Sequence, residues 1–312
     1  MIWSVFLLAP PLEVLLTTPG TLALHKPAGL ATQRRIDTES SLIGQVRREL
    51  SNPDAELPHR LDAIAGGIVV VATDRASLRA HNAAIAARLW GPKVYVARCR
   101  RPSDSRIASA LRGANDARAG TDDPVAAALI GAHRAYLKTS GRRAVCVRSG
   151  GKPSFLDVLL AAPCPVDRSV LDLVISIRTG RFHQIRAMMA HAGAPLLHDP
   201  LYDEAARPSP SAPPPFLTHA LLGLPVPSEG GVRVVRAARL APPACEPPDA
   251  TVCELLDRLA ADIARAASTA TPGVALSLSC DRATGVVSVV EGGRTGTAAP
   301  GQAPVYAPLS PT

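Results

Sequence analysis

The chain has 312 residues, 47% of them hydrophobic, so it can bury a sizeable core and cannot be disordered throughout. Its 34 Lys and Arg against 26 Asp and Glu give a formal charge of +8, which suits a polyanionic partner. The six scattered cysteines form no CxxC pair, which argues against a zinc ribbon or a redox dithiol and favours a reduced, cytoplasmic protein. The apolar opening MIWSVFLLAP is too short to span a bilayer, so we expect no membrane association.

Hydrophobic patterning predicts strands mixed with helices along the chain. Strands are expected twice within 13–26, around a Pro-Gly turn, and then at 68–72, 93–99, 171–177, 217–222, 232–236 and 285–290. Helices are expected at 40–50, 75–90, 124–136, 181–191 and 251–267. This mixture, with several hairpin-like pairs, indicates an α+β domain. No glycine-rich nucleotide-binding motif is present, so we expect no cofactor.

The first polar segment whose side chains could take part in catalysis or binding precedes the predicted strand at 68–72. His59 and Arg60 stand just before Asp62, and Gly66-Gly67 follows. Basic neighbours would keep a partly buried carboxylate ionised. Taken alone, such a cluster is more often a surface ion pair of little energetic value.

The second polar segment runs from Arg178 to Arg186 with the sequence RTGRFHQIR. It places three arginines, a glutamine and a histidine where a strand is expected to pass into a helix. Either phosphate binding or pairing with a carboxylate would suit an arginine there. His183 and His191 lie eight residues apart and have no third ligand nearby, so we expect no metal.

Together with two other segments, these motifs resemble those of the RluA-type pseudouridine synthases. HRLD resembles that family's catalytic loop, and TGRFHQIRAMMAHAGAPLLHDPLYD its later signature, usually GR-x-HQIR followed by GD and a tyrosine. KPAGL and KVYVA resemble its opening motif and its K-x-Y-x-A strand. The four motifs occur in the family's order over roughly residues 20–240.

The resemblance implies specific roles. Asp62 matches the catalytic aspartate, Tyr95 the tyrosine that packs on the target base and helps to move its C5 proton, and Arg186 the arginine that pairs with the aspartate. The remaining matches predict contacts with the RNA or the loop: Arg60 entering the RNA in place of the flipped nucleotide, Leu217 lining the uracil pocket, and Lys26, Arg181 and His183 supporting the loop or binding substrate.

The resemblance also implies a fold and a partner. We expect a mixed, largely antiparallel sheet flanked by helices with a central RNA-binding cleft, in a protein that isomerises uridines of ribosomal or transfer RNA as a monomer. The catalytic domain would span 20–267, after a lead-in strand at 1–19 and before a low-charge, disordered tail at 268–312. Within it, 101–153 is expected to be an insertion and 207–215 a proline-rich loop.

One departure from the family pattern keeps a second function open. After the aspartate the family usually has x-x-T-S-G, whereas this chain has Ala63-Ile64-Ala65-Gly66-Gly67. Two hydroxyls that would hold the loop are therefore missing, at a cost on the order of 1 kcal/mol each. The alternative is a catalytically inactive relative that binds RNA as a structural or assembly factor. A kinase interpretation of HRLD fails, because position 67 is glycine where an asparagine is required.

Overall fold

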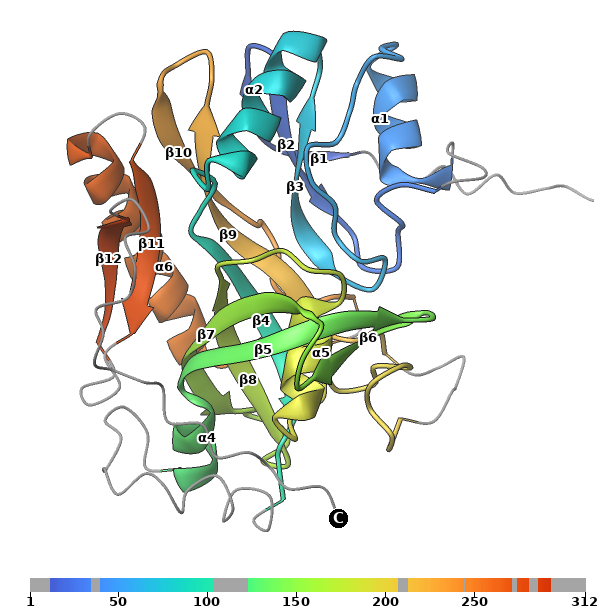
Figure 1. Cartoon of the computed structure of the whole chain (residues 1–312), viewed down its shortest axis with the longest axis vertical. Coiled ribbons are helices and arrows are strands. Elements are labelled where there is room, and N and C mark those ends of the chain that lie inside the picture. The colour runs from blue at the N-terminus through green and yellow to red at the C-terminus, as the bar shows by residue number, and fades with distance from the viewer. Residues whose placement is uncertain are drawn as a thin grey trace, which may run out of the picture.

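The structure is a computed structural model that describes residues 12–34, 40–103, 123–206, 213–243, 245–270, 274–280 and 286–292. In this part of the chain ten strands form one sheet (Figure 1). Along the sheet their order is β1 (Glu13–Thr18), β2 (Thr21–Lys26), β3 (Gly66–Ala72), β9 (Leu217–Val226), β4 (Lys93–Arg100), β8 (Val170–Ile177), β7 (Lys152–Pro163), β5 (Gly131–Ser140) and β6 (Arg143–Val147), with β10 (Gly231–Arg236) also paired to β9.

Every described pair of this sheet is antiparallel except β3 with β9, so the predicted mixed, largely antiparallel α+β fold is confirmed. The parallel contact is short and places Gly67 beside His219. Gly67 has φ +98°, and a Cβ there would lie 2.2 Å from the His219 carbonyl oxygen. Only glycine lets the two backbones approach this closely.

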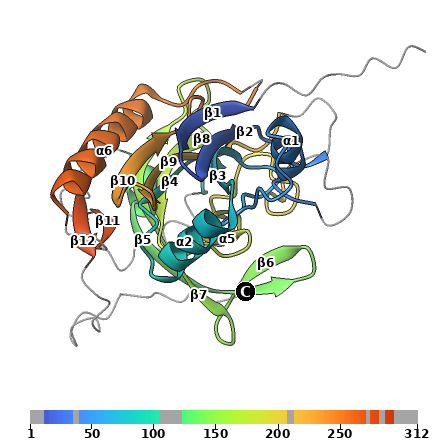
Figure 2. The same cartoon turned by 90° about the horizontal axis from the view of Figure 1, so that it is seen from above.

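Helices cover the sheet at several places, namely α1 (Leu42–Glu49), α2 (Arg75–Ala86), α4 (Pro124–Leu129), α5 (Gln184–His191) and α6 (Ala250–Thr269). The carboxylates of Asp74 and Asp249 accept backbone N–H groups at the starts of α2 and α6, as expected for N-caps. Seen from above, the β5–β6 hairpin projects from the body of the sheet (Figure 2).

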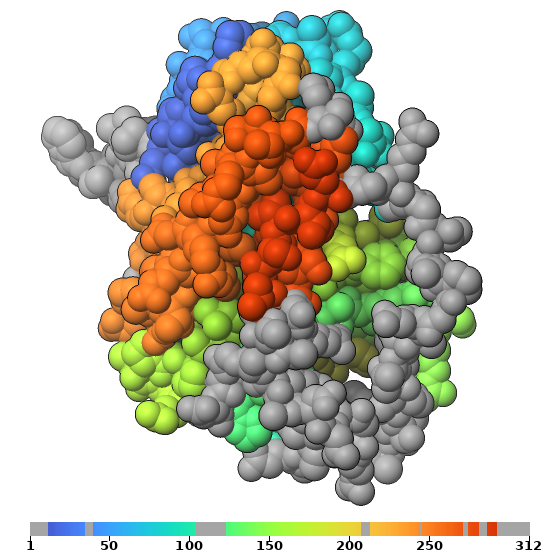
Figure 3. All heavy atoms as spheres, turned by 90° about the vertical axis from the view of Figure 1, so that its left-hand side faces the viewer, coloured from blue at the N-terminus to red at the C-terminus, as the bar shows by residue number. Residues whose placement is uncertain are grey.

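Apolar residues gather in two main cores. One includes Leu42, Val46, Tyr95 and Met189, and so lies between the sheet and helices α1 and α5. The other lies beneath the buried face of α6, where Leu256 and Leu259 pack against Val94 and Val174. The second core also takes in a separate hairpin, β11 (Ala275–Cys280) with β12 (Val287–Gly292), which forms one band with α6 across that side of the molecule (Figure 3).

Most predicted elements lie within a few residues of their expected places, but residues 124–153 of the segment 101–153 were wrongly predicted. The helix expected at 124–136 ends at Leu129, and the ten-residue strand β5 follows in its place. Residues 131–153 therefore belong to the main sheet rather than to an irregular insertion. Residues 104–122 of that segment, 1–11 of the lead-in, 207–212 of the proline-rich loop and 293–312 of the tail lie outside the described residues. The domain limits themselves stay predictions.

Candidate active site

The loop that carries Asp62 is held by hydrogen bonds from Gly29, in the KPAGL segment, and from Thr32, which follows it. The Thr32 hydroxyl donates to the Leu61 carbonyl oxygen at 2.7 Å and accepts from the Leu61 N–H at 3.2 Å. The Gly29 N–H donates to the Ala63 carbonyl oxygen at 2.7 Å. These bonds flank Asp62 on both sides. The loop is thus fastened although the family's Thr-Ser pair is absent.

The Lys26 ammonium lies beneath the same loop and is fully buried. It donates to the carbonyl oxygens of Pro27 at 3.0 Å, Leu30 at 2.6 Å and Ala63 at 3.3 Å. Burial lowers the pKa of Lys26 to about 7, against the opposing attraction of Asp62. Its position fits support of the loop and leaves it out of reach of an RNA backbone.

Lys26 should make stability depend on pH. Its folded pKa of about 7 lies below the ordinary 10.5, so between these values the unfolded chain binds more protons than the folded one. The free energy of unfolding should therefore rise with pH in this window, relative to a Lys26→Met variant. Urea unfolding of both proteins at pH 7, 8 and 9 measures the difference. A difference that does not change with pH would contradict the assignment.

Removing the Thr32 hydroxyl should loosen the loop. Thr32→Val deletes both bonds to Leu61 and leaves buried backbone groups unpaired, which should cost about 2 kcal/mol of unfolding free energy. We also expect a lower kcat on an RNA substrate, because Asp62 is then less well positioned. Thr17→Val, at an exposed position of β1, is the matched control and should change neither quantity. Equal behaviour of the two variants would show that Thr32 does not hold the loop.

The second half of the site lies at the start of α5. The Gln184 side chain fixes the preceding turn: its oxygen accepts from the Arg181 N–H at 3.0 Å and from the Thr179 hydroxyl at 2.8 Å, and its amide donates to the Phe155 carbonyl oxygen at 2.9 Å. His183 takes the N-cap position in the left-handed region, with φ 52°, and its side chain does not cap the helix. An unfavourable backbone conformation thus frees the imidazole for other contacts. This turn explains why α5 begins at Gln184 and not at 181 as predicted.

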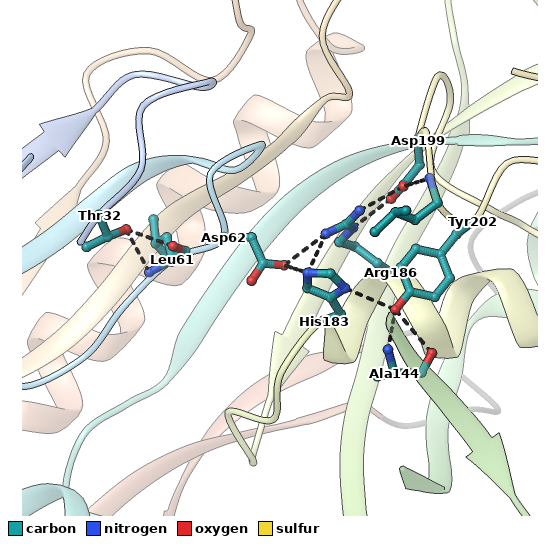
Figure 4. A network of polar contacts seen from close by, with 9 residues as sticks. Thr32, Leu61, Asp62, Ala144, His183, Arg186, Asp199 and Tyr202 are labelled. Atoms are coloured by element: carbon teal, nitrogen blue, oxygen red, sulfur yellow. Dashed lines mark hydrogen bonds and ion pairs between the residues drawn. The ribbon is translucent and has the colours of Figure 1, made fainter. Parts of the chain in front are cut away.

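Asp62 and Arg186 come together from these two halves (Figure 4). The Asp62 Oδ2 lies 3.5 Å from Arg186 Nη1 and 3.8 Å from His183 Nε2, with the Asp62 side chain 24% exposed. Arg186 is itself buried and makes a bidentate pair with Asp199, at 2.7 Å and 2.9 Å. Asp199 therefore holds the guanidinium, which presents its remaining nitrogen to Asp62.

The hydrogen bonds of His183 define its tautomer. Arg186 Nη1 donates to His183 Nε2 at 2.8 Å, so Nδ1 carries the proton and donates to the Tyr202 hydroxyl at 3.1 Å. That hydroxyl donates to the carbonyl oxygen of Ala144 on β6 and accepts from its N–H. Burial, and to a lesser degree the charge of Arg186, lowers the pKa of His183 against the attraction of Asp62. His183 is thus a neutral acceptor that helps to aim Arg186 at Asp62.

Tyr95 lies on β4 against the His219 imidazole, with ring centroids 4.6 Å apart and ring planes 14° from parallel. His219 donates from Nδ1 to the Ile68 carbonyl oxygen at 2.8 Å, and burial lowers its pKa to about 4. Burial first, and then the charge of Asp62, raises the pKa of Tyr95 well above its usual value. The Tyr95 phenol therefore keeps its proton at neutral pH.

The other predicted residues are split between surface and core. Arg60 and Arg181 are exposed, and their contact with RNA stays a prediction. Leu217 is only 4% exposed, at the start of β9, and belongs to the same core as Tyr95. Asp199 and Tyr202 stood in the recognised signature, but their bonds to Arg186 and His183 could not be read from sequence.

One cavity of about 470 Å³ lies beside the KPAGL segment, and its lining does not include Asp62. It is lined mostly by apolar residues, which include Pro27, Ala28 and Leu30. No helix among the described residues is both long enough and apolar enough to cross a bilayer.

Comparison with known proteins settles the family. The model of the RNA pseudouridylate synthase family matches residues 20–191, which contain Asp62, Tyr95 and Arg186. The chain belongs to this family. A ribosomal large subunit pseudouridine synthase D from Pseudomonas aeruginosa is 29% identical over 196 residues, covering 61% of this chain and 53% of that relative. The match thus spans about half the length of the curated relative.

Solved pseudouridine synthase structures share the fold. Human RNA pseudouridylate synthase domain containing 1 superposes with a TM-score of 0.55 at 17% identity, covering 79% of this chain and 95% of the human one. Human RNA pseudouridylate synthase domain containing 4 gives 0.51 at 16% identity, covering 79% and 92%. At these identities the similarity concerns the fold alone.

Proposed function

We propose that this pseudouridine synthase family member isomerises uridines to pseudouridine in structured RNA, with Asp62 as the catalytic carboxylate. The observation that carries the proposal is the contact between Asp62 and Arg186, whose side chains lie 3.5 Å apart. The two residues come from separate segments of the region that matches the family model. Since Asp199 fixes the guanidinium, Asp62 faces a positive charge that does not move.

The reaction needs the atoms that this site offers. The bond between N1 of uracil and C1′ of ribose breaks, a bond between C5 and C1′ forms, and the C5 proton is replaced by one on N1. A nucleophilic carboxylate can carry such an exchange, because it forms and releases a covalent intermediate without a redox step. Asp62 is partly exposed and can meet a nucleotide that has left its stack.

Tyr95 supports the same proposal, because its ring can receive the flipped base. Its ring is buried against His219 on one face, and the charge of Asp62 contributes, after burial, to raising the pKa of its phenol. Because this hydroxyl keeps its proton, we propose that Tyr95 acts by stacking and by hydrogen bonding rather than as a ready phenolate base.

We propose ribosomal RNA as the first substrate to examine, because the curated relative is named for the large ribosomal subunit. Transfer RNA is the alternative. We further propose a cytoplasmic monomer, which suits the six free cysteines. A net charge of +8 supplies long-range attraction to either RNA.

Pseudouridine mapping tests the proposal in the cell. RNA from a strain lacking this protein should lose pseudouridine at defined positions, and the wild-type gene should restore them while Asp62→Ala does not. Restoration of every lost site by Asp62→Ala would overturn the catalytic assignment. Rescue of growth without any change in pseudouridine would instead favour an inactive RNA-binding assembly factor. The bonds from Thr32 and Gly29 argue against that rival, since they hold the loop without the Thr-Ser pair.

A further inference from the structure

The β5–β6 hairpin and the start of β7 are basic and free of acidic residues. From residue 131 to residue 156 there is no Asp or Glu, and all the Lys and Arg of this stretch are exposed: Arg134, Lys138, Arg142, Arg143, Arg148 and Lys152. None of them forms an ion pair with a described acidic residue. So dense a patch of unneutralised positive charge attracts a polyanion.

The hairpin has two faces of different character. Leu137 and Ala144 point inward and are buried, where the hairpin contacts α5. Arg134, Tyr136 and Lys138 alternate with the inward residues and therefore point outward. Phe155 on β7 pairs directly with Arg134 and lies on the same outward face. The inward face is used for packing, which leaves the outward face available for a partner.

Two half-exposed aromatic rings and an arginine occupy this outward face. The Arg134 guanidinium carbon lies 5.6 Å from the centroid of the Tyr136 ring and 5.4 Å from that of Phe155. Aromatic residues make up only 3% of the chain, so two together on one basic surface are unusual for this protein. Rings and guanidinium planes are the groups on which unpaired bases stack.

The surface continues to Asp62 through two neighbouring residues. Arg181 is exposed, and its Nε lies 3.4 Å from the carbonyl oxygen of Pro153, the partner of Tyr136 in the sheet. Phe182 is 49% exposed and stacks on His183 with centroids 3.8 Å apart. Since His183 lies 3.8 Å from Asp62, contacts lead in steps from the start of β7 through Arg181 and Phe182 toward the carboxylate, and with the hairpin residues these side chains form a strip of rings and arginines.

We propose that this strip, formed by Arg134, Tyr136, Phe155, Arg181 and Phe182, binds an unpaired RNA strand that flanks the target uridine. The inference rests on the proposed function, and it adds the surface on which the RNA strand beside the target uridine would lie. Bases stack on Phe182 and on the rings beside Arg134, while Arg181 and the hairpin cations meet phosphates. A paired strand would not fit, because its base faces are covered by its own neighbours.

Fluorescence anisotropy with a 12-nucleotide unpaired RNA, labelled at its 5′ end and carrying one central uridine, tests the strip. Tyr136→Ala and Phe182→Ala should each weaken binding about 5- to 100-fold with little change in salt dependence. Lys138→Gln and Arg142→Gln should weaken it less and each reduce the slope of log K against log salt by about 0.7. The same oligomer annealed to its complement should bind wild type and Tyr136→Ala equally.

Matched controls lie elsewhere on the surface. Arg258→Gln on α6 and Val166→Ala, which is 67% exposed, should bind within twofold of wild type. The strip is disproved if wild type does not bind the oligomer at low salt, or if the ring variants behave like the controls. Pseudouridine formation by wild type is measured separately. An inactive wild type whose ring variants lose binding would overturn the proposed function and leave the strip intact.

Discussion

Asp62→Asn is expected to reduce pseudouridine formation by about 10⁴-fold or more while leaving RNA binding nearly unchanged. Asparagine has the size and hydrogen-bonding shape of aspartate, but it cannot act as an anionic nucleophile. The free energy of unfolding should change little, since Asp62 is partly exposed and its contact with Arg186, at 3.5 Å, is secondary to the pair with Asp199. Single-turnover assays with excess enzyme separate the chemical step from binding.

Asp54→Asn provides the matched control for this experiment. Asp54 is an exposed carboxylate in the turn before the catalytic loop, and its side chain makes no bond to the site. The Asp54→Asn variant loses the same charge as Asp62→Asn and should keep full activity. Substantial turnover by Asp62→Asn would remove Asp62 from the chemistry and direct attention to another acidic group.

The largest effect on stability is expected from Arg186→Met. This change leaves Asp199 fully buried without its counter-ion, which should cost about 3–5 kcal/mol of unfolding free energy. Adding Asp199→Asn removes the stranded charge and keeps an acceptor for the Leu201 N–H, so the double variant should regain most of that stability. Activity should stay lost in both variants, because Asp62 no longer faces a cation. Urea unfolding and single-turnover rates give the two measurements.

The chain offers a second buried pair as a control. Arg98 and Asp172 form an equally buried bidentate ion pair, at 2.7 Å and 2.9 Å, on β4 and β8. Arg98→Met should destabilise the fold by a similar amount, and Asp172→Asn should again relieve it. The folded fraction of these variants should remain active. If they are as inactive as the Arg186 variants, loss of activity reflects general destabilisation and not the loss of a group that faces Asp62.

Much of this architecture was predictable because strong local patterns mark it. The β-branched run at β3 and the alternation at β4 indicate strands without any tertiary information. The hairpin strands β5 and β6 were missed because arginine, alanine and glycine interrupt their apolar alternation. What makes them strands is the pairing of β5 with β7, the pairing of β6 with β5, and packing on α5, and these contacts form only when the chain folds.

In the site, too, some features were predictable from the sequence and others depend on contacts made by folding. Motif order predicted Asp62, Tyr95 and Arg186 as site residues, and the structure brings Asp62 and Arg186 together. Sequence alone did not reveal that Asp199 holds Arg186 or that Thr32 bonds to the backbone of Leu61, because these contacts join segments that meet only in the folded chain. The left-handed backbone at His183 was equally hidden, since it arises from bonds made by Gln184 to its neighbours in space.

The position of β9 has a consequence for when activity can arise during synthesis. Asp62 follows from the block β1–β3 and Arg186 from the block β4–β8, and in the main sheet these blocks meet only through β9, which lies between β3 and β4. Because β9 begins at Leu217, a growing polypeptide that ends before it carries both halves of the proposed site but lacks the strand that lies between them in the sheet. Such long-range closure is slow and comes late. A polypeptide that ends before β9 is therefore expected to lack the proposed pseudouridine synthase activity.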